Sequence, residues 1–201
     1  MTGSHLTPTA CPSATPGSLP PKQITPKQMI ALLAGETLVD INAHTPWGGA
    51  VTASIYLPMV RSHLWSQLTH YSRWVRYFPD IVKSEILDQT SARSGQRRRL
   101  YQAARKAFLV FPVEVEIFLT VSERFEERIR FSLAQGSFKD FSADLQLQDC
   151  GDGTILTYSV AATPLLPVPG LLIQETMRMD LPANMRHMRQ VLCGPVVQFA
   201  K

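Results

Sequence analysis

The clearest amphipathic pattern in the chain predicts a long helix over residues 171–192. Apolar side chains recur there at three- and four-residue spacing, which places them on one face of a helix. Methionine is flexible and polarizable, so this face suits either the packing of an irregular core or the lining of an apolar cavity. The residues of the apolar face are Ile173, Met177, Leu181, Met185, Met188 and Leu192.

Upstream of this helix, period-two alternation of apolar and polar residues predicts a series of β-strands. Residues 113–121 show it most clearly, because valine, isoleucine and leucine alternate there with glutamate, phenylalanine and threonine. Clean alternation indicates an antiparallel sheet with one solvated and one covered face. The predicted fold class is therefore α+β, with a curved antiparallel sheet wrapped around the long C-terminal helix. The expected strands cover residues 37–42, 50–57, 81–87, 100–109, 113–121, 125–133, 138–147 and 154–162.

Three shorter helices and one loop complete the expected elements. Thr25 as N-cap and Pro26 at the first helical position start a helix that runs to residue 33. Residues 59–68 and 72–78 predict two short helices after the first core strand, because each has helical spacing and a proline beside it. Residues 91–99 (SARSGQRRR) are expected to form a basic loop.

These elements divide the chain into four segments. Residues 1–28 are rich in proline, serine and threonine and contain no acidic side chain, so we expect a disordered tail. Residues 29–49 form an N-terminal extension with a short helix and a strand. Residues 50–193 form the α+β domain, and residues 194–201 a C-terminal tail.

The composition favours a soluble, cytoplasmic protein. The hydrophobic fraction of 45% supports a sizeable core, and no apolar run approaches the roughly 18 residues that a membrane span requires. The three cysteines have no metal-type spacing, so neither a disulfide framework nor an oxidising compartment is expected. The net charge of +4 is too small to indicate nucleic-acid binding by itself.

Four motifs resemble those of the helix-grip, START-like superfamily (SRPBCC), which includes polyketide cyclases and dehydrases and the coenzyme Q-binding proteins. The first is LTHYSRWVRYFPDI at residues 68–81, where His70 stands at the position of a family aspartate. The others are GSFKDF at residues 136–141, DGT at residues 152–154 and LPANM at residues 181–185. The likeness covers residues 50–192 and implies the helix-grip fold.

The resemblance also implies a cavity between the sheet and the long helix, closed by the two short helices. Aromatic side chains concentrate on those short helices, where they offer stacking surfaces to a quinone ring or an isoprenoid chain. Simple sealing of the core is the alternative. The candidate ligand-binding residues are Trp65, Tyr71, Trp74, Phe78, Phe131, Phe141, Tyr158, Met177, Leu181 and Met185.

The arginines of the expected basic loop form a second candidate site, together with two arginines on the same side of the resembled fold. Such a cluster can dock transiently on an anionic membrane surface, at about 1 kcal/mol per basic residue near the lipid. The protein would then be peripheral to a membrane, whereas a solvated charged loop is the alternative. The residues are Arg73, Arg76, Arg93, Arg97, Arg98 and Arg99.

The predicted function is the binding, and carriage, of a hydrophobic small molecule such as a quinone, an isoprenoid or a lipid. An enzyme is favoured less, because no nucleophile motif, phosphate loop or metal-ligand cluster is recognisable. No catalytic residue, metal or cofactor is therefore expected. Two alternatives stay open: a ribosome- or RNA-associated factor that uses the basic loop, and a cyclase-like enzyme that uses the same cavity.

Overall fold

The computed structural model describes residues 24–92, 95–108, 111–166 and 168–194. Residues 1–23 and 195–201, which make up most of the two expected tails, lie outside this part of the chain. The helices are α1 (Pro26–Leu33), α2 (Arg61–Leu68), the 3-10 helix η1 (Tyr71–Arg73), α3 (Trp74–Tyr77) and α4 (Gly170–Cys193). The strands are β1 (Leu38–Asn42), β2 (Gly49–Leu57), β3 (Ile81–Ala92), β4 (Gly95–Phe108), β5 (Phe111–Arg124), β6 (Arg128–Gly136), β7 (Phe138–Cys150) and β8 (Gly153–Pro164).

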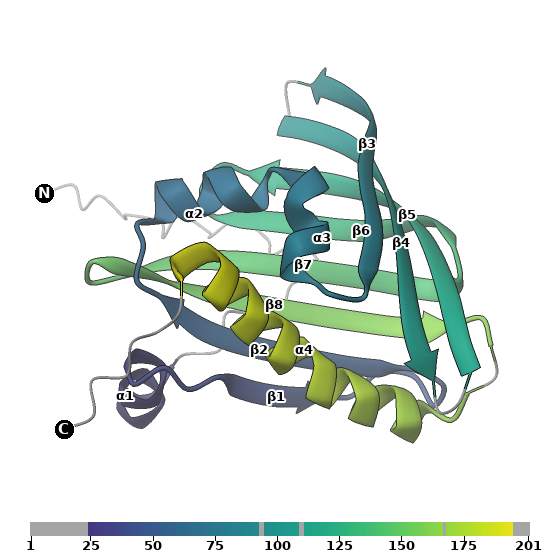
Figure 1. Ribbon diagram of the computed structural model, residues 1–201, viewed down its shortest axis with the longest axis horizontal. Coiled ribbons are helices and arrows are strands. Elements are labelled where there is room, and N and C mark those ends of the chain that lie inside the picture. Colours follow the sequence, from purple (N-terminus) through teal and green to yellow (C-terminus); the bar gives the residue numbers. More distant parts are fainter. Residues whose placement is uncertain (1–23, 93–94, 109–110, 167, 195–201) are drawn as a thin grey trace, which may run out of the picture.

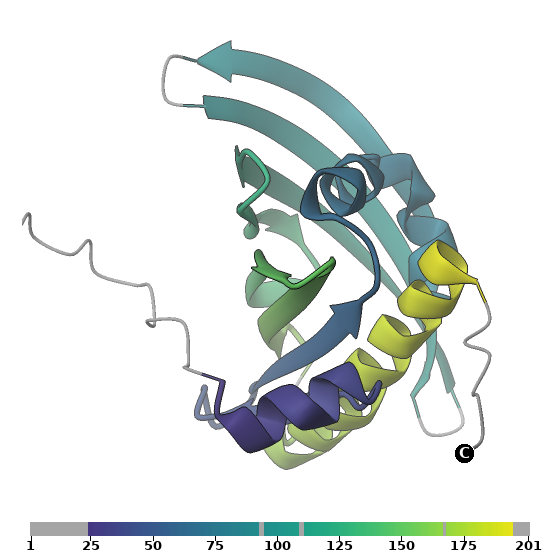
Figure 2. The ribbon, with the colours of Figure 1, turned by 90° about the vertical axis from the view of Figure 1, so that its left-hand side faces the viewer.

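The described strands form one antiparallel sheet in the order β1-β2-β8-β7-β6-β5-β4-β3. Helix α4 crosses this sheet diagonally and packs on β2 (Figure 1). Strands β3 and β4 arch strongly, which shows the curvature of the sheet (Figure 2). The predicted α+β class is confirmed, as is the helix-grip arrangement of a curved sheet, a long C-terminal helix and short helices after the first core strand.

The alternation in the sequence becomes the inner face of the sheet. Residues in register on neighbouring antiparallel strands share a face, so the pairing defines rows that run across the strands. Both rows are apolar over β2, β8, β7 and β6, and both end in a charged residue on β4 or β5. One row is Val51, Val160, Ala143, Phe131, Val121 and Arg98, and the next is Ala53, Tyr158, Leu145, Ile129 and Glu123.

Helix α4 extends the predicted helix by one residue at each end. Leu181, Met185 and Met188 are buried, whereas Ile173 and Met177 nearer the N-terminus are only part-buried. The predicted apolar face is therefore the face toward the sheet. None of the described helices combines the length and the apolar composition needed to cross a membrane.

The prediction of a basic loop at residues 91–99 is wrong, because the described residues of this segment pair as β-strands. Strands β3 and β4 form a hairpin whose pairing reaches Ala92 and Gly95, next to residues 93 and 94, which lie outside the described part. Alternate residues of a strand face opposite sides, so a run of arginines is compatible with a strand whose outer face is wet. Arg97 and Arg99 are exposed, while Arg98 between them faces inward.

The strand expected at residues 125–133 begins only at Arg128. Strand β5 continues to Arg124, and Glu126 then adopts a φ of 54°, the left-handed conformation of a tight turn. The N–H of Glu127 donates to the carbonyl of Arg124 at 3.0 Å and closes this turn. Phe125 lies in the turn and is 74% exposed, so its apolar side chain does not continue the inner face.

The N-terminal extension adds α1 and an edge strand to the domain. Helix α1 begins, as predicted, at Thr25, which forms a capping box with Gln28. Gly35 follows the helix with a φ of 95°, and Arg189 of α4 donates to its carbonyl at 3.2 Å. Strand β1 pairs with β2, so the extension is tied to both the sheet and the long helix.

Candidate functional site

An aromatic cluster occupies the space between α3 and the inner face of the sheet. We define it as Tyr71, Trp74, Phe78, Phe131 and Tyr158, all of which are buried. Trp74 lies at its centre, with its ring centroid 5.0 Å from Phe131 and 5.1 Å from Phe78, on which it stacks. These are favourable aromatic separations, so the structure brings five of the candidate ligand-binding residues into mutual contact.

The remaining candidate residues surround this cluster at different depths. Leu181 and Met185 are buried on α4, and Trp65 of α2 is 7% exposed beside the ring of Phe125. Met177 lies near Gly49 of β2, where an added Cβ would come within 3.1 Å of the methionine sulfur. Phe141 is part-buried and contacts the ring of Phe138, away from the cluster.

Burial of the inner face decreases along the strands toward the N-terminal half of α4. On β6, Ile129 and Phe131 are buried, whereas Leu133 is part-exposed. The same change occurs on β7 and α4, and on β8 Val160 is part-exposed between the buried residues Tyr158 and Ala162. We call the part-exposed residues the apolar rim: Leu133, Phe141, Val160, Ile173 and Met177. Among the described residues, the apolar interior therefore approaches the surface on this side.

A polar clamp closes the opposite side of the inner face. It consists of Tyr71, Arg98 and Glu123, with Arg98 Nη1 3.3 Å from Glu123 Oε1. The Tyr71 hydroxyl donates to the same carboxylate oxygen at 2.7 Å, and Arg98 also donates to the Thr69 carbonyl at 3.2 Å. Burial, followed by the Glu123 carboxylate, raises the pKa of Tyr71. The clamp therefore joins η1 to β4 and β5 through interactions largely shielded from water.

The clamp contains a largely buried charged residue, Glu123, that the sequence analysis missed. Glu123 continues the inward positions of β5 after Ile117, Leu119 and Val121, so a carboxylate stands where the alternation demands an apolar residue. The alternation of inward and outward positions along this strand would have been enough to identify Glu123 as an inward-facing charge. Arg98 was recognised, but as a surface residue rather than the partner of Glu123.

The basic residues of the second candidate site do not form one surface. Arg98 belongs to the polar clamp, and Arg99 lies 3.6 Å from Asp88 on the outer face. Arg73 donates to Gln67 at 2.6 Å, and Arg76 is exposed on α3. Arg93 was also predicted to belong to this site, but it lies outside the described residues.

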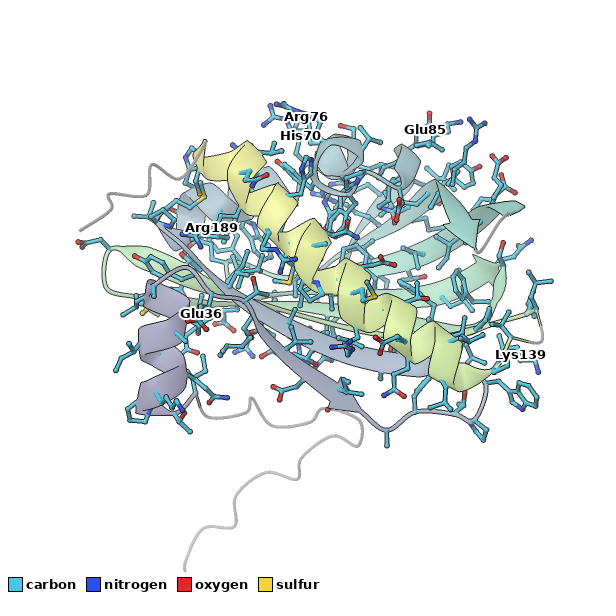
Figure 3. The ribbon with its side chains drawn as sticks, turned by 60° about the horizontal axis from the view of Figure 1, so that its bottom comes forward. Glu36, His70, Arg76, Glu85, Lys139 and Arg189 are labelled. Carbon is cyan, nitrogen blue, oxygen red and sulfur yellow. The ribbon has the colours of Figure 1, made fainter. Side chains whose placement is uncertain are left out.

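A different basic surface is formed by the short helices and the C-terminal half of α4. Residues 59–79 and 181–194 contain no aspartate or glutamate. They are adjacent in space, because α3 packs on α4 and His187 Nε2 donates to the Arg76 carbonyl at 3.2 Å. Figure 3 shows His70 and Arg76 at this end of the molecule and Lys139 at the opposite end. We call this surface the basic face: His63, His70, Arg73, Arg76, Arg186 and His187.

A groove of about 230 Å³ lies within the basic face. Its lining combines basic and polar side chains of α2 and α3 with two apolar side chains from the end of α4. The lining residues are His63, Gln67, Arg76, Tyr77, Val191 and Leu192. The groove is separate from the apolar rim, which lies along the N-terminal half of α4.

One histidine–carboxylate pair bears on the enzyme alternative. His44 Nε2 lies 2.8 Å from Asp140 Oδ1 and 3.3 Å from Thr163 Oγ1. A Ser/Thr-His-Asp relay needs the carboxylate on one ring nitrogen and the nucleophile on the other, whereas both contacts here use the same nitrogen. The group instead ties the loop before β2 to β7 and β8. Within the described residues, no group of three or more His, Cys, Asp or Glu could hold a metal ion.

Comparison with known proteins identifies the family. A family described as polyketide cyclase / dehydrase and lipid transport matches residues 58–189, which include the short helices, the aromatic cluster and most of α4. The chain belongs to this family, and the START-like resemblance seen in its motifs is confirmed. A search of curated proteins gave no match.

Solved structures share the fold at low sequence identity. A protein from Thermus thermophilus is 17% identical, with a TM-score of 0.62 over 72% of this chain and 97% of its own. A START superfamily protein from Mycobacterium smegmatis is 19% identical, with a TM-score of 0.57 over 75% and 99%. The Zhui aromatase/cyclase from Streptomyces sp. R1128 is 11% identical, with a TM-score of 0.57 over 73% and 92%.

Proposed function

We propose that the protein binds a hydrophobic small molecule of the quinone, isoprenoid or lipid class between the inner face of the sheet and α4. The apolar rim is the observation that carries this proposal. It joins a solvent-facing edge to the aromatic cluster without an intervening charge among the residues that define them. Apolar side chains left part-exposed beside a deep apolar interior are typical of ligand sites.

The family supports the same class of function. Its description pairs polyketide cyclases with lipid transport, and one structural neighbour is a STAR-related lipid transfer protein from Xanthomonas axonopodis. Both descriptions are consistent with a hydrophobic ligand. The His44–Asp140 pair lacks the geometry of a nucleophilic relay, so it gives no support to hydrolytic chemistry.

Mass spectrometry of an organic extract tests the proposal most directly. Protein purified from its native cells should carry an enriched quinone, isoprenoid or lipid relative to a mock purification. The variant Phe141→Arg, which places a charge on the apolar rim, should lose the compound. Ile41→Arg is the matched control, because Ile41 is 51% exposed on β1. Two outcomes would contradict the proposal: equal retention of the compound by both variants, or an extract of the native protein without any enriched hydrophobic compound.

Carriage requires contact with a membrane, and we propose that the basic face makes it. Arg76 and Arg186 are exposed there, and Val60 and Val75 on the same acid-free segment are 58% and 39% exposed. Basic residues interspersed with exposed apolar ones suit an anionic lipid surface. The hairpin arginines are less suited, since Arg99 has an acidic partner and Arg98 faces inward.

Vesicle binding distinguishes these two surfaces. With phosphatidylserine-containing vesicles, Arg76→Gln combined with Arg186→Gln should weaken binding roughly 30-fold, at about 1 kcal/mol for each charge. Arg97→Gln combined with Arg99→Gln is the control and should change binding much less. Binding that ignores salt, a control that loses as much, or a preference for RNA over vesicles at the same ionic strength would overturn docking by the basic face.

A further inference from the structure

Tyr158 is an inner-face residue placed deep in the proposed ligand site. It pairs with Ala53 on one side and Leu145 on the other, and only 7% of its surface is exposed. Its ring centroid lies 5.9 Å from that of Phe78 and 6.5 Å from that of Trp74. The phenol is therefore surrounded by apolar and aromatic side chains.

The hydroxyl of Tyr158 differs from the other polar groups of the cluster. Tyr71 donates to Glu123 at 2.7 Å, and Trp74 Nε1 donates to the Leu68 carbonyl at 2.9 Å. The Tyr158 hydroxyl makes no hydrogen bond within the described part of the chain, and burial is the only cause that raises its pKa. The hydroxyl oxygen is not among the fully enclosed unpaired atoms of the described residues, so it keeps a small exposed area through which water or a ligand oxygen can bond to it.

The position of this hydroxyl suits a ligand that enters from the apolar rim. Val160, a rim residue, is two positions along β8 on the same inner face. A ligand lying over Val160 would therefore extend its inner end toward Tyr158. In the row of Tyr158, the nearest charge is Glu123, which is separated from it by Leu145 and Ile129 and is already bound by Tyr71 and Arg98.

These neighbours also restrict the chemistry of the ligand. A carboxylate or phosphate beside Tyr158 would be buried among apolar side chains without a cation, which is strongly unfavourable. A neutral oxygen, in contrast, would satisfy the hydroxyl at little desolvation cost. The matching ligand has an apolar body and a neutral hydrogen-bonding oxygen at its buried end.

We propose that the Tyr158 hydroxyl anchors a neutral carbonyl or hydroxyl oxygen of the ligand. This inference rests on the proposed function and makes it more specific, because it selects quinone-, phenol- or sterol-like molecules over plain hydrocarbons and over lipids whose charged end is buried. Tyr158 is then the residue that determines specificity, and the rest of the aromatic cluster supplies the apolar contacts.

Two probes of equal size test the anchor. 2-Naphthol and 2-methylnaphthalene differ in the exchange of a hydroxyl for a methyl group, and calorimetric titration can measure each against wild type and Tyr158→Phe. The variant should bind 2-naphthol roughly tenfold more weakly and 2-methylnaphthalene at least as well, as expected for one lost hydrogen bond. Tyr101→Phe is the control, because Tyr101 donates to Glu116 on the outer face.

The outcomes separate the inference from the function on which it rests. If both probes bind and Tyr158→Phe weakens them equally or not at all, the anchor is wrong and apolar binding stands. If neither probe binds the wild-type protein, the site does not accept aromatic ligands of this size. That result would contradict both the Tyr158 anchor and the proposed binding site for aromatic ligands. The unfolding midpoint of Tyr158→Phe should not fall, since no bond within the described protein is lost; a marked fall would give the hydroxyl a structural role instead.

Discussion

Arg98 of β4 and Glu123 of β5 form an ion pair on the inner face of the sheet, with Nη1 and Oε1 3.3 Å apart. Their side chains are only 14% and 8% exposed. Because the pair also holds Tyr71 and the Thr69 carbonyl, it links the segment between α2 and α3 to the sheet. The short helices that cover the aromatic cluster are thus held partly by charge, which makes their attachment open to test.

Glu123→Gln should be strongly destabilising. Removal of one partner leaves Arg98 shielded from water without its carboxylate, which typically costs about 3–5 kcal/mol in the free energy of unfolding. Asp88→Asn breaks the Arg99–Asp88 pair, whose side chains are 58% and 53% exposed, and should cost at most about 1 kcal/mol. Urea unfolding of both variants checks this, and equal losses would mean that the inner pair is as well solvated as the outer one.

Stability should fall at alkaline pH. The pKa values of Tyr71, Tyr77 and Tyr158 are raised in the fold, in each case chiefly by burial. An unfolded tyrosine ionises near its ordinary value of about 10, so the unfolded state gains stability above that pH while the folded state does not. The contribution of these tyrosines to the free energy of unfolding should therefore be level below about pH 10 and decrease above it.

Urea unfolding across this range measures the decrease, and ultraviolet difference spectroscopy follows the phenols directly. In the native protein the phenols of Tyr71 and Tyr158 should stay neutral until unfolding begins, and that of Tyr77 should ionise above its ordinary pKa. Tyr71→Phe should reduce the steepness of the alkaline loss. Free ionisation of these phenols in the folded protein would show that they are open to solvent.

Met185→Ala should leave a cavity beneath α4. Met185 is fully buried among the inner-face residues, and truncation of such a side chain costs about 2–5 kcal/mol. Met179 on the same helix is 63% exposed, so Met179→Ala should change stability by no more than about 0.5 kcal/mol. Thermal unfolding distinguishes them. Similar effects of the two substitutions would place the apolar face of α4 elsewhere.

Gly136→Ala should disturb the β6–β7 connection, and this explains the glycine of the GSFKDF motif. Gly136 has a φ of 143°, and a Cβ there would lie 2.4 Å from the Glu116 carbonyl oxygen. Gly151→Ala is a useful comparison, because Gly151 also has a positive φ of 57° but nothing within 4 Å of its added Cβ. We expect a loss of about 1 kcal/mol at Gly151 from backbone strain and a clearly larger one at Gly136. A smaller loss at Gly136 would contradict the close approach.

Local patterns in the sequence determined the elements and the fold class. The spacing of apolar residues from Ile173 to Leu192 and the alternation in residues 113–121 predicted α4 and β5, because burial of one face requires that periodicity. The capping box at Thr25 and Gln28 located the start of α1 from local hydrogen bonding alone. The order of the motifs led to the family, because each motif marks a turn or a packing contact of this fold.

Tertiary structure decided which side chains meet. Composition made residues 91–99 resemble a loop, but pairing with β3 and β5 turned them into a strand and placed Arg98 inside and Arg97 outside. The partnership of Arg98 with Glu123 joins residues far apart in the chain. The same is true of the basic face, which combines residues of α2, α3 and α4, and of the contacts of Tyr158 with Trp74 and Phe78. Periodicity reports the face on which a residue lies, whereas its partner depends on strand order and register, which are long-range properties of the fold.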